Sequence, residues 1–586
     1  MRSSSLWPSL IINAAFVAAP LLLSSIAAAQ VPAAPQIAWL PDSVALTNGS
    51  AQIEVTWNLW WGENGDAWKL RQNGAVVHSA TLVPNGQNAQ TGSRSVTVAS
   101  AGSYSFVVDL CRGSGANERC TASAPRSVTV TGSGGGGGGG GGDDGLVWPA
   151  PLLEHNRAYT NSTNAVVGAY FVEWSVYGRA FPVRSIPASN LTHLLYAFIA
   201  ICGPNDSLLQ ANPQGYQALV QECSDQPNYT VTIHDRFAAL EKSYPGDAWN
   251  TPIRGNFGQL IRAKRAQPNL KILPSIGGWT LSDPFFHLAG DPARRATFIN
   301  SVVQFLQTYT FFDGVDLDWE YPGGGGANAT LGSAADKANY SALLTELRTA
   351  LDNLGTQTGR QYLLTAAVGA APAKISAIDY SVARQKLDLV FAMTYDYYGG
   401  WNNQLGHQAG LYPVPNEPQA GFSGSATVAN LIAAGMPANR IALGVAMYGR
   451  GWQGVTGAQP GNPFAGVGGG ALNPGTWEAG VLDYRHIEDQ FAGGENGAGT
   501  NGYVTGYNTT AEGAWAWNAA TGKLVTYENT RSARAKGQFA RANGLAGVFS
   551  WEIDADNGRI LNAMHEGLGH GAGGNDRIFA NAFQSP

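Results

Sequence analysis

Charged residues are scarce in this sequence. Its 586 residues include 35 Lys and Arg and 41 Asp and Glu, 13% in all, and the formal net charge is -6. No segment gathers basic residues into the kind of patch that binds a phosphate backbone. We therefore expect no nucleic-acid partner.

Long apolar segments are also lacking, apart from one near the start. Arg2 precedes a mostly apolar stretch at 10–23, and Ala27 and Ala29 form a small-residue cleavage pattern. This arrangement predicts a signal peptide at 1–29 and a secreted, extracellular protein. No later stretch has the run of about 18 or more apolar residues that a membrane helix needs, so no membrane partner is expected.

Cysteine and histidine are few, with four Cys and nine His. Two close couples favour local disulfides, Cys111–Cys120 and Cys202–Cys223, among the three connectivities that four cysteines allow. Neither couple has the CxxC spacing typical of redox or zinc sites. The histidines form no ligand array. We expect no metal and no other cofactor.

Glycine, in contrast, is abundant at 75 residues. An uninterrupted glycine run lies within 132–145, which is predicted to be a flexible linker. The preceding segment, 30–131, alternates apolar and polar residues and carries the hairpin signal Asn73-Gly74. It is predicted to be an all-β sandwich of the immunoglobulin or fibronectin-III type. The Gly-rich end, 571–586, is predicted to be a disordered tail.

After the linker, short apolar strands alternate with longer, often helical segments. This alternation predicts an α/β fold, a (β/α)8 TIM barrel formed by 146–450 and 530–570. The intervening segment, 451–529, is predicted to be an α+β insertion domain on the face where barrel active sites lie. The predicted barrel strands are 166–172, 193–200, 271–276, 314–318, 363–368, 389–394, 441–446 and 547–550.

The fourth predicted strand concentrates carboxylates in the segment FDGVDLDWEYP at 312–322. Because strand side chains alternate between faces, Asp316, Asp318 and Glu320 are predicted to point the same way. Carboxylates this close cannot all ionise cheaply, so one is expected to hold a proton, and Glu320 at the strand end is the predicted general acid. A solvated acidic edge strand and a metal site are alternatives. The large apolar residues between the acids and the absence of nearby His argue against both.

The spacing of Asp313, Asp316, Asp318 and Glu320, D-x-x-D-x-D-x-E, resembles the signature of the family-18 glycoside hydrolases. The order of sandwich, barrel and insertion is similar to that of the multidomain bacterial chitinases in this family. So are four further segments, SIGGWT at 275–280, MTYD at 393–396, AMYGRGW at 446–452 and FSWEIDAD at 549–556. The resemblance implies hydrolysis of β-1,4-linked N-acetylglucosamine polymers. Chitin and N-acetylglucosamine oligosaccharides are therefore the expected partners, and we expect a monomer.

The resemblance also implies catalytic roles. Glu320 would act as acid and then as base, Asp318 would orient the substrate's acetamido group, and Asp316 would share a proton with Asp318. Tyr395 would hydrogen-bond the acetamido oxygen, whose attack on the anomeric carbon gives an oxazolinium intermediate and retention of configuration. Asp313 would be structural.

Further residues match the family's sugar contacts. A surface track that leads a crystalline chain inward is matched by Trp39, Trp60, Phe237 and Trp249, which suggests processive action with chitobiose as the main product. The cleft contacts match Tyr170, Trp174, Trp279, Met393, Asp396, Trp401, Tyr448, Arg450, Trp477, Glu478 and Trp551.

Two other functions are compatible with such a fold. One is an endo-β-N-acetylglucosaminidase acting on glycoproteins, against which the insertion and the Trp-lined cleft argue. The other is a non-catalytic chitin-binding lectin. Lectins of this kind have lost the terminal Glu of the signature, and Glu320 is present in this chain.

Overall fold

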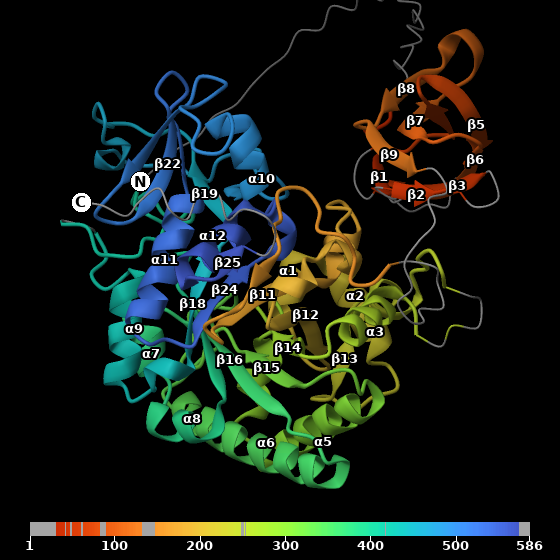
Figure 1. Ribbon diagram of the computed structural model, residues 1–586. Coiled ribbons are helices and arrows are strands. Elements are labelled where there is room, and N and C mark those ends of the chain that lie inside the picture. The colour runs from red at the N-terminus through yellow and green to blue at the C-terminus, as the bar shows by residue number, and fades with distance from the viewer. Residues whose placement is uncertain are drawn as a thin grey trace, which may run out of the picture. The chain divides into compact units, whose positions relative to one another are not determined.

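The computed structural model describes residues 31–40, 43–46, 50–59, 63–82, 90–131, 147–247, 251, 253–415 and 418–572. They belong to two compact units, within 1–135 and 136–586, which Figure 1 shows as ribbons. The predicted signal peptide, the predicted linker and residues 573–586 of the predicted tail lie outside the described residues.

The first unit is all-β and has two sheets, which confirms the predicted sandwich. One sheet has the order β1-β3-β6, and the other has the order β2-β9-β7-β4-β5 with β8 paired to β7. Alternate residues of β3, Ile53, Val55 and Trp57, are buried in its core. Asn73 and Gly74, at φ 48° and 85°, form the predicted turn between β4 and β5. The strands are β1 Gln36–Trp39, β2 Ser43–Ala45, β3 Ala51–Leu59, β4 Ala67–Gln72, β5 Ala75–Thr81, β6 Gln90–Val98, β7 Gly102–Arg112, β8 Arg119–Ala122 and β9 Arg126–Thr131.

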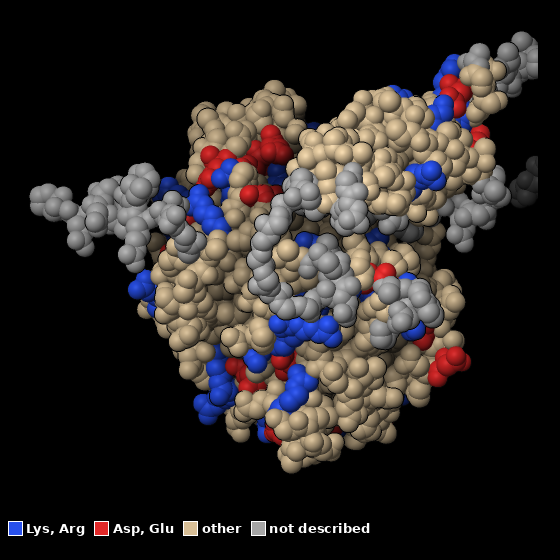
Figure 2. Space-filling model, turned by 45° about the vertical axis from the view of Figure 1, so that its right-hand side comes forward, with Lys and Arg blue, Asp and Glu red and all other residues tan. Residues whose placement is uncertain are grey.

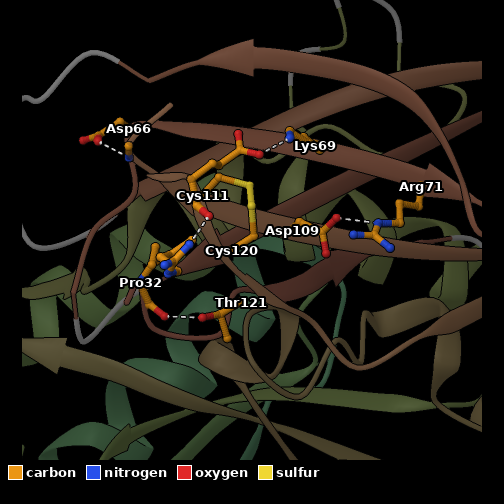
Figure 3. The surroundings of a disulfide bond; sticks show 11 residues. Pro32, Asp66, Lys69, Arg71, Asp109, Cys111, Cys120 and Thr121 are labelled. Carbon is orange, nitrogen blue, oxygen red and sulfur yellow. Dashed lines mark hydrogen bonds and ion pairs between the residues drawn. A yellow bond between two sulfur atoms is a disulfide. The ribbon is translucent and has the colours of Figure 1, made fainter. Parts of the chain in front are cut away.

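Both predicted disulfides are present, and each closes a local segment. Cys111 on β7 is bonded to Cys120 on β8, beside an ion pair in which Arg71 Nε lies 2.5 Å from Asp109 Oδ2 (Figure 3). The second bond, Cys202–Cys223, joins the end of strand β12 to the end of helix α2. The local pairing predicted from the spacing of the cysteines is confirmed.

The second unit is built on a closed parallel barrel. Its strands follow the order β11-β24-β18-β17-β16-β15-β14-β12, and a pairing of β11 with β12 closes the ring; β13, Val231–Ile233, adds an antiparallel strand beside β12. All eight predicted strands are confirmed, each within one residue of its predicted end. They are β11 Val166–Val172, β12 His193–Ile201, β14 Lys271–Gly277, β15 Gly314–Asp318, β16 Leu363–Gly369, β17 Leu389–Met393, β18 Ile441–Ala446 and β24 Gly547–Trp551.

Helices surround the barrel (Figure 1). Local sequence explains where they begin and end: at α5 the Asp291 carboxylate accepts the N–H groups of Ala293 and Arg294, and α6 ends at Gly359, which adopts φ 69°. The helices are α1 Asp206–Ala211, α2 Pro213–Glu222, α3 Gly255–Ala266, α4 Asp283–Leu288, α5 Pro292–Thr308, α6 Asp336–Thr358, α7 Pro372–Ser376, α8 Tyr380–Lys386, α9 Gly424–Ala433, α11 Thr530–Ala542 and α12 Arg559–Leu568.

The predicted insertion contains a five-stranded antiparallel sheet of order β20-β19-β23-β22-β21 and the helix α10, Tyr484–Ile487. Its first strand starts at Tyr448, because the residues of the AMYGRGW segment leave β18 and pair with β20 and β23. The predicted boundary at 451 is therefore too late. The strands are β19 Tyr448–Trp452, β20 Val481–Asp483, β21 Val504–Asn508, β22 Gly513–Asn518 and β23 Lys523–Tyr527.

The end of the described chain is also ordered further than predicted. Gly571 and Ala572 form β25, which pairs with Tyr159 and Thr160 of β10. The prediction of disorder from 571 is therefore wrong for these two residues, because the edge formed by β10 supplies their hydrogen-bond partners.

The surface reflects the low content of charged residues. Figure 2 shows one face on which uncharged residues dominate and Lys, Arg, Asp and Glu side chains occur in small groups of both signs. Among the described residues, no helix combines the length and the apolar character that crossing a bilayer requires.

Candidate active site

The carboxylates of β15 lie on the inner side of the barrel wall, as the alternation of strand residues predicts. Asp316 and Asp318 are both buried. The intervening residues Val315, Leu317 and Trp319 join the apolar layer between the strands and the helices. Glu320 follows two residues after the strand ends and is partly exposed. The row therefore runs from a buried interior towards the open end of the barrel.

Asp316 is held by three hydroxyl groups, two from the neighbouring strands β14 and β16 and one from β11 across the barrel. Tyr170 Oη on β11 and Ser275 Oγ on β14 donate to its Oδ2 at 2.8 and 2.7 Å, and Thr365 Oγ1 on β16 donates to its Oδ1 at 2.6 Å. Burial raises the pKa of Asp316, while the three hydrogen bonds oppose that shift. The carboxylate is thus fixed in place and shielded from water.

Tyr170 requires a correction. It was predicted to contact substrate, but its side chain is only 1% exposed and its hydroxyl donates to Asp316. The structure gives it the role of holding Asp316.

Asp318 lies between its two carboxylate neighbours. Burial is the largest cause that raises its pKa, followed by the charges of Glu320 and Asp316. Its Oδ1 has no hydrogen-bond partner among the described residues. A buried carboxyl group with a free oxygen and a high pKa can hold a proton and offer it to a polar group placed above it.

Glu320 has electrostatics suited to proton transfer near neutral pH. Burial raises its pKa to about 7; a hydrogen bond from Tyr321 opposes this shift, the charge of Asp396 adds to it, and the charge of Lys374 opposes it. A carboxyl group with such a pKa can give up a proton and take one back at the same pH.

The backbone that carries Glu320 is fixed by a serine. The Ser282 hydroxyl accepts the N–H of Glu320 at 2.9 Å and lies 3.1 Å from the carbonyl oxygen of Asp318. Gly277, at φ 109°, allows the close approach of the neighbouring strand: a Cβ there would lie 2.3 Å from the same carbonyl oxygen. Any other residue at 277 would therefore push the two strands apart.

Tyr395 follows β17 and reaches the same space. It is 8% exposed, and burial followed by the charge of Asp318 raises the pKa of its phenol, so the hydroxyl remains a donor. Its ring lies against Gly444 of β18, where a Cβ would be 2.9 Å from Tyr395 Cε1. Only glycine at 444 leaves room for this ring.

A second polar group lies beside the acid row. The Asp396 carboxylate accepts hydrogen bonds from Tyr448 Oη at 2.7 Å and from Arg450 Nε and Nη2 at 2.7 and 2.6 Å. The Arg450 guanidinium also lies 5.2 Å from the ring centre of Trp401. These residues come from the loop after β17 and from β19, so barrel and insertion both contribute to the site.

Aromatic side chains surround these polar groups. Trp551, at the end of β24, is partly exposed, and its ring centre lies 5.4 Å from that of Tyr170 and 5.6 Å from that of Phe198. Four of the predicted sugar contacts are exposed tryptophan side chains, with exposed fractions of 44% for Trp174, 51% for Trp279, 57% for Trp401 and 45% for Trp477. Exposed indole rings are platforms on which flat, weakly polar ligands can stack. Of the remaining predicted contacts, Met393 is partly buried and Glu478 is exposed.

The remaining predicted residues lie elsewhere or cannot be placed. Trp60 and Trp249 are outside the described residues, and so is the side chain of Trp39. Phe237 is half exposed. Asp313, at the opposite end of β15, accepts hydrogen bonds from Lys264 Nζ at 2.7 and 2.9 Å and from the N–H of Ile272, which is a structural arrangement.

One cluster in the described part of the chain has the spacing of a metal site. It consists of Cys111, Glu118 and Cys120. Both cysteines are engaged in the same disulfide, so their thiolates are not available as ligands.

Sequence reasoning missed several residues that position the site. Thr365 and Ser282 are among them, as is Gln408, whose side chain bonds both the Asp396 N–H and the Tyr448 carbonyl. The location of Thr365 on the strand beside the acid row is a signal that could have found it. Ser282 and Gln408 lie in loops, and nothing in the sequence marks them.

Comparisons with known proteins agree with this geometry. The family model described as glycosyl hydrolases family 18 matches residues 166–556, and the model described as Chitinase A, N-terminal domain matches residues 32–162. Chitinase A of Pseudoalteromonas piscicida is 44% identical over 545 residues, which cover 88% of this chain and 64% of the relative. A chitinase of Autographa californica nuclear polyhedrosis virus is 41% identical over 520 residues, covering 88% of this chain and 89% of the viral protein.

Solved structures show the same fold. Chitinase ChiA74 from Bacillus thuringiensis matches with a TM-score of 0.62 and 34% identity, covering 71% of each chain. The catalytic domain of the psychrophilic chitinase B from Arthrobacter TAD20 matches with a TM-score of 0.59 and 30% identity, covering 70% of this chain and 97% of that one.

Proposed function

This chain belongs to glycosyl hydrolase family 18, and from that premise we propose that it is a chitinase, which hydrolyses β-1,4 bonds between N-acetylglucosamine units. The observation that carries the proposal is the row of Asp316, Asp318 and Glu320, in which the last carboxyl group has a pKa of about 7 and is accessible. The relatives named as chitinases support the choice of substrate.

Glu320 protonates the oxygen of the leaving sugar. Its raised pKa keeps it protonated up to neutral pH, and its position at the open end of the row gives it access to a bound ligand. The proton moves to the glycosidic oxygen as the bond to the anomeric carbon breaks. The resulting carboxylate then removes a proton from water in the second step, which restores the acid form.

The substrate supplies the nucleophile. The carbonyl oxygen of its own acetamido group attacks the anomeric carbon, forms a cyclic oxazolinium ion and leaves the configuration retained after hydrolysis. A nucleophile attached in the correct orientation has an effective concentration of about 10^5 M or more. The protein must therefore orient the acetamido group, and Asp318, with its free Oδ1, and the Tyr395 hydroxyl are the groups available for this.

Asp318 also stabilises the positive charge of the intermediate. Its pKa is raised by burial and by two neighbouring carboxylates, so it carries a proton before the reaction. The hydroxyl donors of Asp316 favour its charged form and so keep this proton on Asp318 at first. When the oxazolinium ion forms, its positive charge favours an ionised Asp318, and the proton passes to Asp316, which becomes neutral.

The finer parts of the proposal concern the polymer. The four exposed tryptophans support binding of an extended chain and processive release of chitobiose. The signal-peptide pattern at 1–29 supports secretion. We propose a monomer, since one chain supplies every residue of the mechanism.

Two measurements test this function. Fully deacetylated polymer lacks the nucleophile, so we expect hydrolysis of chitin and none of the deacetylated chain at equal concentrations. Similar rates on both polymers would contradict substrate assistance. On crystalline chitin, disaccharide should dominate the early products, whereas a broad ladder of oligomers would contradict processive action.

A further inference from the structure

Gln408 is a fully buried glutamine that joins the loop bearing Asp396 to Tyr448 on strand β19. Its Oε1 accepts the N–H of Asp396 at 3.1 Å, and its Nε2 donates to the carbonyl oxygen of Tyr448 at 3.0 Å. We propose that Gln408 is a positioning residue for catalysis, which holds Asp396 and Tyr448 in the arrangement that places the Asp396 carboxylate towards Glu320.

The backbone of Asp396 needs such support. It adopts φ 56°, the left-handed region that residues with a side chain rarely occupy. Strained conformations of this kind persist only where neighbouring contacts enforce them. The bond from the Asp396 N–H to Gln408 is such a contact, and the carbonyl of Gln408 adds another by accepting the N–H of Tyr397 at 2.9 Å.

The same amide fixes the partner of Asp396. The backbone carbonyl oxygen of Tyr448 accepts the hydrogen bond from Gln408 Nε2, and the Tyr448 hydroxyl donates to Asp396 Oδ1 at 2.7 Å. Gln408, Asp396 and Tyr448 therefore close a ring of contacts. Arg450 extends this ring through its two bonds to the Asp396 carboxylate.

The consequence for the reaction rests on the proposed hydrolysis. Asp396 is a negative group that acts on Glu320 and raises its pKa, with Lys374 and the Tyr321 hydroxyl acting in the opposite direction. Asp318 belongs to the same row, and the charge of Glu320 is one cause of its raised pKa. If Asp396 turns away from the site, the pKa of Glu320 falls, and the acid form is lost at a lower pH.

The contacts require an amide. At this position one atom must accept from an N–H group and another must donate to a carbonyl oxygen, which a carboxylate cannot do. A protonated carboxyl group can do both. A glutamate at 408 therefore restores the contacts only in its acid form. Residue 408 contacts the backbones of Asp396 and Tyr448, Arg450 is paired with the Asp396 carboxylate, and His407 precedes it in the chain. The ionisation of a glutamate there will respond to the opposite charges of Asp396 and Arg450.

The test uses the full chain and a soluble N-acetylglucosamine oligosaccharide, with kcat and KM measured across pH. Gln408→Met keeps the length of the side chain and removes both bonds. We expect kcat/KM to fall about tenfold or more and the basic limb of its pH profile to move to lower pH. At acidic pH the kcat/KM of Gln408→Glu should approach the wild-type value. As pH rises, the new glutamate ionises, and the pH profile should show this as one added ionisation with loss of activity.

The matched control is Gln419→Met. Gln419 lies in the same loop, and its Nε2 donates to the Tyr397 carbonyl at 3.4 Å without contacting Asp396 or Tyr448. This variant should keep the wild-type profile.

The outcomes separate the inference from the function it rests on. An inactive wild type would refute the proposed hydrolysis. The inference alone would be overturned if the wild type is active, the kcat/KM of Gln408→Met lies within twofold of the wild-type value, and the basic limb of the variant's pH profile has not moved. If Gln408→Met fails to fold, Gln408→Glu decides: a profile without the added ionisation overturns the inference.

Discussion

The hydroxyl of Tyr170 lies 2.8 Å from Oδ2 of Asp316 and donates a hydrogen bond to it across the interior of the barrel. This contact joins the first barrel strand to the fourth. It shows that the innermost carboxylate of the row is held by the barrel scaffold and leaves the outer two to face a ligand.

Tyr170→Phe should slow the reaction. The change removes one of three donors that favour the charged form of Asp316, so the Asp316 pKa rises and the shared proton moves to Asp316 before the reaction, where Asp318 can no longer offer it to the acetamido group. Hydrogen bonds to charged groups contribute about 1.5–3 kcal/mol, and we expect kcat to fall about 10- to 100-fold in assays with a chitin oligosaccharide. Tyr380→Phe is the control, since the buried Tyr380 hydroxyl has no partner among the described residues. An equal fall of kcat in Tyr170→Phe and Tyr380→Phe would contradict the role of Tyr170.

Stability should depend on pH through Glu320. The pKa of Glu320 is about 7 in the folded protein, against 4.5 for an exposed glutamate. Between these values the folded state holds a proton that the unfolded chain has released, so the stability from this group is present at lower pH and is lost as pH rises through the window.

Glu320→Gln should therefore reduce this pH dependence without removing it, because the raised pKa of Asp318 acts in the same direction. Urea unfolding at several values between about pH 4.5 and 7 measures the effect. An identical slope in the variant and the wild type would show that the environment of Glu320 does not raise its pKa.

The buried pair of Lys536 and Glu528 supplies a third prediction. Lys536 Nζ donates to Glu528 Oε1 at 2.5 Å and to the carbonyl oxygens of Gly444 and Thr394 at 2.7 and 3.0 Å, and both side chains are buried. Lys536→Met leaves a carboxylate buried without its partner and should cost about 3–5 kcal/mol of unfolding free energy.

Adding Glu528→Gln to Lys536→Met should recover part of this loss, because the uncompensated charge is gone. Chemical denaturation of both single variants and of the double variant measures the coupling free energy between Lys536 and Glu528. If the double variant loses the sum of the unfolding free energies that the single variants lose, a direct interaction between the two side chains is contradicted.

The barrel and its acid row could be predicted because their signals are local. The run from Gly314 to Asp318 alternates carboxylates with large apolar residues, and each of the eight strands is a short apolar segment with clear ends. The hairpin at Asn73 and Gly74 was equally clear, because few residues tolerate its backbone angles.

What could not be predicted depends on contacts between distant segments. The boundary at Tyr448 follows from pairing of β19 with β23, which comes after β20, α10, β21 and β22 in the chain. The hydrogen bond between Tyr170 and Asp316 joins residues 146 positions apart, and the one between Gln408 and Tyr448 joins residues 40 positions apart. Spacing along the chain carries no information about such pairs.

The most direct test of the account is the activity of Glu320→Gln on a chitin oligosaccharide, with binding measured on the same preparation. The amide keeps the shape of the side chain and cannot deliver the proton to the leaving oxygen. We predict that hydrolysis is lost while the oligosaccharide still binds with near wild-type affinity. Turnover close to that of the wild type would contradict the assignment of Glu320 as the acid.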